Sequence, residues 1–206
     1  MQDLTVTLLQ TALAWHEPAA NRAHFSELLR GLPEPADLVV LPEMFTTGFT
    51  MDVRGQAETM AGPTVAWMAG LARELNVTLC GSLIVEEAGR FHNRCVWMPP
   101  DGRLVHYDKR HLFRMAGEHE HFTAGDRREI VTLKGWRICP LVCYDLRFPV
   151  YSRNRSDVER KHAPVQRERD GPADEPASPL RSQEDVVEAA RVLEIPHEDR
   201  TGEGEE

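Results

Sequence analysis

The composition of the chain changes abruptly near residue 159, and this change limits what each part can fold into. All 14 aromatic residues of the 206-residue sequence precede it. The residues from Arg160 onward include only 12 hydrophobic residues and carry a net charge of −6, out of −9 for the whole chain. So few apolar side chains cannot offset the entropy lost on ordering such a segment. We therefore expect a folded domain over residues 1–159 and a mostly disordered acidic tail over residues 160–206.

One stretch of the tail, residues 182–195, has the pattern of an amphipathic helix. Ser182 can cap its start, and Asp185 lies at the capping-box position three residues later. Four apolar residues share one face of such a helix: Val186, Val187, Ala190 and Leu193. The spacing predicts one helix here, and the tail shows no residues arranged for chemistry.

The first 159 residues alternate between apolar runs and amphipathic stretches, which is typical of an α/β sheet domain. Runs typical of strands cover residues 4–9, 38–41, 78–85, 91–98, 104–108, 129–133 and 137–142. Helical spacing covers residues 21–29 and 66–75. Turns are predicted at residues 99–102 and at Lys134-Gly135. Residues 110–128 lack periodicity, so we expect a long functional loop there.

Charge, hydropathy and cysteine spacing exclude several kinds of protein. An acidic chain lacks the surplus of Lys and Arg that nucleic-acid binding requires. No apolar run approaches the ~18 residues of a membrane helix, and the first residues do not resemble a signal peptide, so the expected location is the cytoplasm. The cysteines include no C-x-x-C pair, which argues against a zinc knuckle. Cys80, Cys95 and Cys139 lie inside strand-like runs and are expected to be structural.

Three residues that could do chemistry come directly after expected strands. Glu43 follows residues 38–41, Lys109 follows residues 104–108, and Cys143 follows the last apolar run. If these strand ends meet, the carboxylate can take the proton of the thiol and the ammonium can stabilise an oxyanion formed on an attacked acyl carbon. Taken singly, each has a structural interpretation as well: a buried cysteine and two solvated strand ends.

A metal site is a further interpretation of the same region. The candidate ligands are His106, His111, His119, His121 and Cys143. Only His119-Glu120-His121 is closely spaced, and an irregular loop does not fix alternate side chains on one face. The sequence therefore favours a site without metal.

Three segments, in a fixed order along the chain, have distinctive amino-acid sequences. They are Leu41-Pro42-Glu43-Met44-Phe45, Tyr107-Asp108-Lys109-Arg110-His111-Leu112-Phe113 and Leu141-Val142-Cys143-Tyr144-Asp145-Leu146-Arg147-Phe148-Pro149. Together they resemble the nitrilase, or carbon–nitrogen hydrolase, superfamily; Gly62-Pro63-Thr64 and residues 117–125 also fit. Within it, the chain is most similar to bacterial omega-amidases, over about residues 4–159. The resemblance implies a nitrilase-type α-β-β-α sandwich.

The resemblance also implies an activity: release of ammonia from the side-chain amide of a small 2-oxo acid amide such as 2-oxoglutaramate. Carried over to this sequence, Cys143 is the nucleophile that forms a thioester, and Glu43 is the general base. Lys109 stabilises the tetrahedral intermediate. Glu118 positions the substrate and supports proton transfer, with Glu120 as the alternative.

Two residues near Cys143 are expected to contact the substrate. The backbone N–H of Tyr144 is a second donor to the oxyanion, and Arg147 either pairs with a substrate carboxylate or forms a structural ion pair. The expected partner is a small-molecule amide, and the family implies a homodimer. It implies neither a metal nor an organic cofactor.

The resemblance ends near residue 159, where the family continues with further strands and helices. Residues 160–206 show no equivalent of them, which predicts a gene truncated or shifted in reading frame near Arg160. The competing hypothesis for function is then a catalytically inactive fragment that acts only by association with another chain.

Overall fold

Five strands form the larger of two β-sheets in the computed structural model, which describes residues 2–153 and 193–195. Their order in the sheet is β1-β2-β3-β4-β5. The bounds are β1 Val6–Leu8, β2 Leu38–Val40, β3 Thr78–Glu87, β4 Arg90–Met98 and β5 Val105–Asp108. Strands β1, β2 and β3 run parallel, whereas β4 and β5 are antiparallel to their neighbours. The parallel strands are joined by connections that contain helices, as parallel pairing requires.

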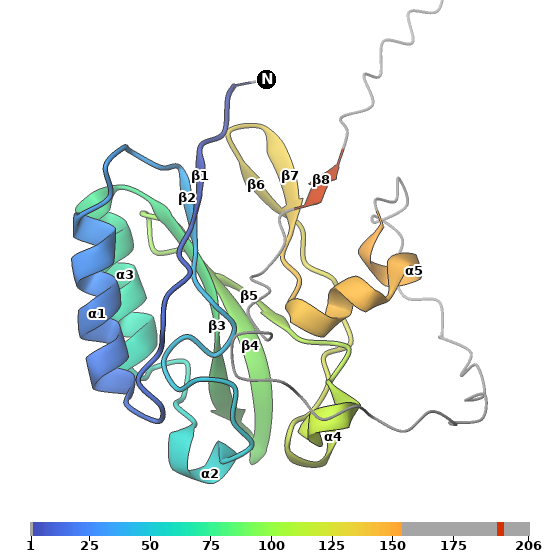
Figure 1. The fold of residues 1–206 in the computed structure, drawn as a ribbon. Coiled ribbons are helices and arrows are strands. Elements are labelled where there is room, and N and C mark those ends of the chain that lie inside the picture. Colours follow the sequence, from blue (N-terminus) through green and yellow to red (C-terminus); the bar gives the residue numbers. More distant parts are fainter. Residues whose placement is uncertain (1, 154–192, 196–206) are drawn as a thin grey trace, which may run out of the picture.

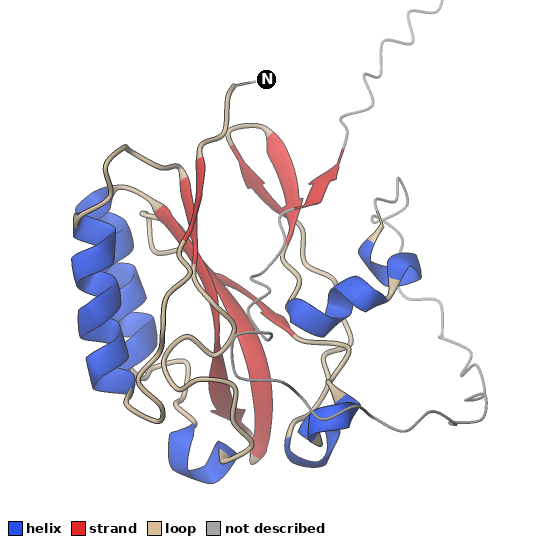
Figure 2. Ribbon diagram, in the orientation of Figure 1, coloured by secondary structure: helices blue, strands red, loops and turns tan. Residues whose placement is uncertain are grey.

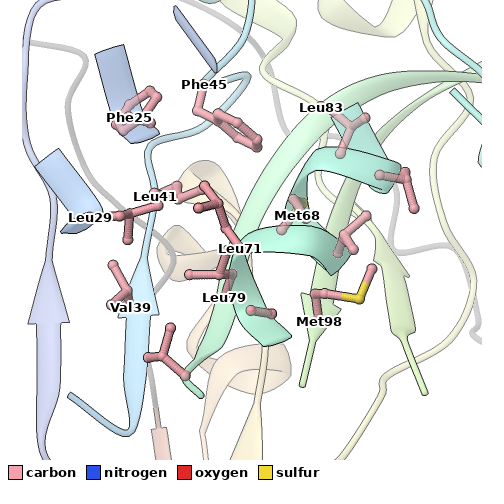
Figure 3. Packing of buried hydrophobic residues seen from close by; sticks show 14 of the residues in the cluster. Phe25, Leu29, Val39, Leu41, Phe45, Met68, Leu71, Leu79, Leu83 and Met98 are labelled. Atoms are coloured by element: carbon pink, nitrogen blue, oxygen red, sulfur yellow. The ribbon is translucent and has the colours of Figure 1, made fainter. Parts of the chain in front are cut away.

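Two helices cover one face of this sheet (Figure 2). They are α1, Pro18–Arg30, and α3, Pro63–Leu75, and each begins with a proline whose fixed φ suits the first turn of a helix. Alternate residues of the strands point toward them, because successive side chains of a strand face opposite ways. The resulting core includes Phe25, Leu29, Val39, Leu41, Phe45, Met68, Leu71, Leu79, Leu83 and Met98 (Figure 3).

The other face of the larger sheet packs against a smaller antiparallel sheet (Figure 1). The smaller sheet contains β6 Val131–Leu133, β7 Trp136–Cys139 and β8 Leu193–Ile195. A second core lies between the sheets and includes Leu38, Val40, Cys80, Cys95, Trp97, Tyr107, Val131, Ile138, Cys139, Leu141 and Val142. The described residues therefore form three layers: helices, the five-stranded sheet and the three-stranded sheet.

All seven strands and both helices predicted for residues 1–159 are present, with shifted bounds. Strand β7 ends earlier than predicted because Pro140 has no N–H to donate to a partner strand. The predicted turn between β6 and β7 is a two-residue hairpin, in which Lys134 and Gly135 have φ of 49° and 85°. Positive φ at both positions matches the twist of the paired strands.

Short helices lie in the segments that were expected to be irregular. The predicted loop over residues 110–128 contains the 3₁₀ helix η1, Arg114–Ala116, and the single-turn helix α4, Glu118–His121. A third short helix, α2, spans Val53–Gln56. After β7 the chain forms the 3₁₀ helix η2, Cys143–Arg147, and then α5, Pro149–Ser152. None of the helices in the described residues is long and apolar enough to cross a membrane.

The helix predicted over residues 182–195 is wrong at its C-terminal end. Leu193–Ile195 form β8, which pairs antiparallel with Arg137, Ile138 and Cys139 of β7. The free edge of β7 offers N–H and C=O groups to another strand, and apolar residues at 193 and 195 fit strand alternation as well as they fit a helix face. Residues 182–192, and the disorder predicted for the rest of the tail, lie outside the described residues.

Candidate active site

The residues of the candidate site meet at one end of the larger sheet. Glu43 follows β2, and Lys109 follows β5. The backbone N–H of Lys109 donates to the carbonyl of Asn93 in β4 at 3.0 Å, so these two residues are neighbours across the strands. By strand alternation, Asn93 lies on the same face as Trp97, which packs toward the smaller sheet. Cys143 reaches this face from the smaller sheet, because it comes after β7.

A buried ammonium joins two carboxylates at this point. Lys109 Nζ donates to Glu43 Oε1 at 2.7 Å and to Glu118 Oε2 at 2.9 Å. The side chains of Lys109 and Glu118 have no exposed surface, and that of Glu43 is 6% exposed. Removing such charges from water is tolerable only when they are paired and hydrogen-bonded. The structure thus brings together three of the four catalytic residues predicted from the sequence in one ion-paired cluster.

The charge of Lys109 is held in place by this environment. Burial disfavours the ammonium, but the charges of Glu43 and Glu118 outweigh burial and hold the pKa of Lys109 above its ordinary value. The ring of Phe49 lies beside the ammonium, with its centroid 5.4 Å from Nζ. Lys109 is therefore a permanent cation near the site, suited to stabilising an oxyanion and unsuited to acting as a base.

The two carboxylates differ in how many of their oxygens are engaged. Both oxygens of Glu118 accept hydrogen bonds from Lys109, and Oε2 also accepts the backbone N–H of Phe113. Glu43 Oε1 accepts from Lys109 and from Asn93, whereas the buried Glu43 Oε2 has no hydrogen-bond partner among the described residues. Glu43 is thus the carboxylate with an oxygen free to accept a proton.

Cys143 lies at the start of a strained turn. Its φ is 42°, in the left-handed region that side chains with a Cβ rarely adopt. The buried carboxylate of Asp145 holds this turn. Asp145 Oδ2 accepts from Val142 N at 3.1 Å and from Tyr107 Oη at 2.8 Å. Asp145 Oδ1 accepts from His111 N at 2.9 Å and lies 2.8 Å from its ring nitrogen Nδ1.

The thiol of Cys143 is protonated at neutral pH. Burial and the negative charge of Glu43 raise the pKa of Cys143 to about 12, and Lys109 opposes the shift. Since the thiolate is the nucleophile, the thiol must pass its proton to a base as it attacks. This requirement fits the free oxygen of Glu43.

Replacing Glu43 with Gln is expected to lower the pKa of Cys143, because a neutral amide no longer repels the thiolate. The pKa can be measured from thiolate absorbance near 240 nm as the pH rises, with Cys143→Ala subtracted to remove the other three thiols. Replacing the exposed Glu34 with Gln is the control and should leave the titration unchanged. An unchanged pKa in E43Q would contradict the assigned effect of the Glu43 charge.

The folded thiol also makes stability depend on pH in the alkaline range. Because its pKa is about 12 in the fold and near the ordinary value of 9.0 when unfolded, the folded state binds more protons between these pH values. The contribution of Cys143 to the free energy of unfolding is therefore complete below pH 9.0 and is lost as the pH rises toward about 12.

Three further residues were predicted for the site: Tyr144, Arg147 and Glu120. The ring of Tyr144 packs edge-on against Phe113 and Phe148, with centroids 5.0 Å and 5.3 Å away. Arg147 is exposed and forms no hydrogen bond or ion pair with the described residues. Glu120 is also exposed and lies 4.0 Å from His119 Nε2, so Glu118 is the glutamate that contacts Lys109.

The histidines considered as metal ligands are dispersed. His111 is bound to Asp145, and His119 lies beside Glu120. Within residues 2–153 and 193–195, no three His, Cys, Asp or Glu side chains are arranged to hold a metal ion.

Sequence reasoning missed two residues of the site. Asn93 donates from Nδ2 to Glu43 Oε1 at 2.7 Å and to Glu118 Oε1 at 3.0 Å. An asparagine in a strand on the same face as Cys95 and Trp97 was a signal that could have revealed it. Asp145 belongs to one of the three motif segments. Its role in holding the Cys143 turn could not be predicted, because it depends on where Tyr107 and His111 lie in the fold.

Gly125 holds the main chain of Lys109 on the side opposite Asn93. The N–H of Gly125 donates to the carbonyl of Lys109 at 3.0 Å. A Cβ on Gly125 would collide with the carbonyl oxygen of Asp108. The loop that carries Glu118 can therefore return to β5 only if residue 125 has no side chain.

The carbon-nitrogen hydrolase family model matches residues 5–180, and the chain belongs to this family. Omega-amidase YafV of Escherichia coli (strain K12) is 47% identical over 160 residues, which cover 77% of this chain and 61% of that protein. The 2-oxoglutaramate amidase of Bacillus subtilis (strain 168) is 27% identical over 155 residues, covering 74% of this chain and 60% of that protein.

A solved structure confirms the nitrilase-type α/β fold. XC1258 from Xanthomonas campestris, a CN-hydrolase superfamily protein with an arsenic adduct in its active site, is 50% identical and superposes with a TM-score of 0.74. The match covers 78% of this chain and 60% of that chain. The alignments thus span about 60% of the length of these relatives.

Proposed function

We propose that this chain is an amidase that hydrolyses the side-chain amide of a small 2-oxo acid amide, such as 2-oxoglutaramate, and releases ammonia. The observation that carries the proposal is the Lys109 ion pair with two carboxylates, one of which has a free buried oxygen, next to the strained Cys143 turn. Similarity to an omega-amidase and to a 2-oxoglutaramate amidase supports the choice of substrate.

In the first half of the proposed reaction, Cys143 Sγ attacks the carbonyl carbon of the amide and its proton passes to Glu43. The carbonyl oxygen becomes an oxyanion, which Lys109 Nζ and the backbone N–H of Tyr144 stabilise. Glu43 then gives the proton to the amide nitrogen. The C–N bond breaks, ammonia leaves and a thioester on Cys143 remains.

In the second half, water attacks the thioester carbon while Glu43 accepts a proton from the water. The second tetrahedral intermediate collapses, the C–S bond breaks and the thiol of Cys143 recovers its proton from Glu43. The products are the dicarboxylic 2-oxo acid and ammonia, and no cofactor is consumed. Glu118 stays hydrogen-bonded to Lys109 throughout and keeps the ammonium oriented.

The surroundings of the cluster support a small substrate. The rings of Phe49 and Phe113 lie with centroids 6.5 Å apart, and Phe113 contacts Tyr144, so aromatic side chains border the ammonium. Arg147, four residues after Cys143, has no partner among the described residues and is proposed to pair with the carboxylate of the substrate.

The purified 206-residue chain is expected to release ammonia from 2-oxoglutaramate, and Cys143→Ala is expected to release none above the buffer rate, because it lacks the nucleophile. Ammonia can be followed with a coupled assay. Cys95→Ala, which alters a buried thiol of the core, is the control and should retain turnover. Turnover by C143A would contradict the proposal. Absent turnover, with equal reactivity of all four thiols in the wild type, would favour the inactive fragment.

A further inference from the structure

Asn93 is the neutral member of the buried cluster, and it contacts both carboxylates. Its side chain is 1% exposed, and each of the two hydrogens on Nδ2 has a different glutamate as acceptor. Ionised carboxylates only accept hydrogen bonds, so chemistry fixes the orientation of the amide with Nδ2 toward them. Asn93 Oδ1 is buried on the opposite side and has no partner among the described residues.

The hydrogen bonds from Asn93 determine which oxygen of Glu43 stays free. Glu43 Oε1 accepts from both Asn93 and Lys109, each at 2.7 Å. With two donors on one oxygen, rotation of the carboxylate would break two charge-assisted hydrogen bonds. If Asn93 did not donate, Lys109 alone would hold the carboxylate of Glu43, and the carboxylate would be freer to rotate.

Asn93 is itself rigidly held. It pairs with Ile84 in the β3-β4 ladder, and its carbonyl accepts the N–H of Lys109. The amide therefore projects from the middle strand of three, between β3 and β5. A donor on a sheet is placed more precisely than one on a loop.

We propose that Asn93 is a positioning residue that clamps Glu43 and Glu118 and thereby leaves Glu43 Oε2 free to accept the proton of Cys143. This role rests on the proposed amidase chemistry. It does not involve contact between Asn93 and the substrate; the amide acts through the two glutamates.

The test is the rate at which iodoacetamide alkylates Cys143 from about pH 6 to pH 9, measured by peptide mass spectrometry on the full chain. The wild type is expected to alkylate Cys143 faster than Cys80, Cys95 or Cys139. Asn93→Leu keeps the size of the side chain but removes the donor. Its rate at neutral pH is expected to fall about tenfold, the effect of one hydrogen bond to a charged group, with an altered pH dependence.

The matched control is Asn21→Leu. Asn21 is also 1% exposed, and its Nδ2 donates to the carbonyls of Ala14 and Thr46, each at 2.7 Å, but it lies in α1 and bonds neither Glu43 nor Glu118. The N21L chain should lose stability and keep the alkylation rate and pH profile of the wild type. If N93L does not fold, as judged by circular dichroism, the smaller Asn93→Ala, which also has no side-chain donor, gives the same comparison.

A double-mutant cycle separates positioning from a general structural effect. In a Glu43→Gln background, adding N93L should change the alkylation rate little, because the carboxylate that Asn93 positions is already gone. Two results would overturn the positioning role alone. One is a double variant whose change in alkylation rate equals the product of the changes in the two single variants; the other is a wild-type rate and pH profile in N93L. Equal alkylation of all four cysteines in the wild type would overturn the proposed function and the positioning role together.

Discussion

Replacing Lys109 with methionine is expected to lower the free energy of unfolding by about 3–5 kcal/mol, because two buried carboxylates lose their only cation among the described residues. Methionine has a similar length, so lost packing contributes little. Ammonia release from 2-oxoglutaramate should disappear as well, since the oxyanion loses a fixed positive charge. Urea denaturation followed by tryptophan fluorescence measures the first effect, and the coupled ammonia assay measures the second.

Two further variants separate the effect of the Lys109 charge on stability from the effect of its packing. The triple variant with Glu43→Gln, Lys109→Met and Glu118→Gln removes all three charges and should recover most of the lost stability without regaining turnover. Lys134→Met removes a partly exposed ion pair with Asp37 and should change the free energy of unfolding by less than about 1 kcal/mol. A K109M chain as stable as the wild type would show that the cluster does not depend on the ammonium.

Replacing Asp145 with asparagine should also have a large effect, although the two side chains have nearly the same shape. Each carboxylate oxygen faces two donor positions, from Tyr107, Val142 and His111. In asparagine, an NH₂ group replaces one of these oxygens, so its hydrogens face N–H or O–H donors and no hydrogen bond can form. The buried donors that lose their acceptor cost about 2–4 kcal/mol of stability. The turn of Cys143 should loosen, and alkylation of Cys143 should slow by about tenfold or more, since 1.4 kcal/mol corresponds to tenfold.

Asp126→Asn is the matched control for this substitution. The side chain of Asp126 is 86% exposed and lies 3.6 Å from Arg127, so its charge is screened by solvent. Thermal unfolding and Cys143 alkylation of D126N should match the wild type. If D145N matched the wild type too, the Asp145 hydrogen bonds would not be what holds the turn of the nucleophile.

The sequence predicted the strands and the residues at their ends for a physical reason. Strands are visible in the sequence as runs rich in apolar and β-branched residues, so the residues that directly follow them can be identified, and Glu43, Lys109 and Cys143 all occupy such places. Strands β2 and β5 run in the same direction, so their ends lie at the same end of the larger sheet, and Cys143 approaches from the smaller sheet packed on it. The pattern could not show that Lys109 bonds both glutamates, because the distances depend on how the sheets pack.

Residues outside the strand ends were harder to predict. Glu118 was identified by resemblance alone, because the segment around it has no periodicity. The structure places Glu118 at the first position of α4, after Gly117, whose φ of 73° ends one turn and starts the next. Asn93 gave only a weak signal, since a single polar residue in a strand has many uses. Residues 193–195 satisfied helical and strand spacing equally, and the free edge of β7 decided between them.

The close approach of Gly125 to Asp108 also bears on which positions of this loop can accept another side chain. The exposed positions of the loop, such as Glu120 and His121, can change without touching the main chain that carries Lys109. Gly125 cannot be replaced in this way, because any side chain there would displace the end of β5. If the proposed amidase activity holds, residues at the outer turn of the loop can vary to suit other amides, whereas Gly125, only a few residues away, cannot.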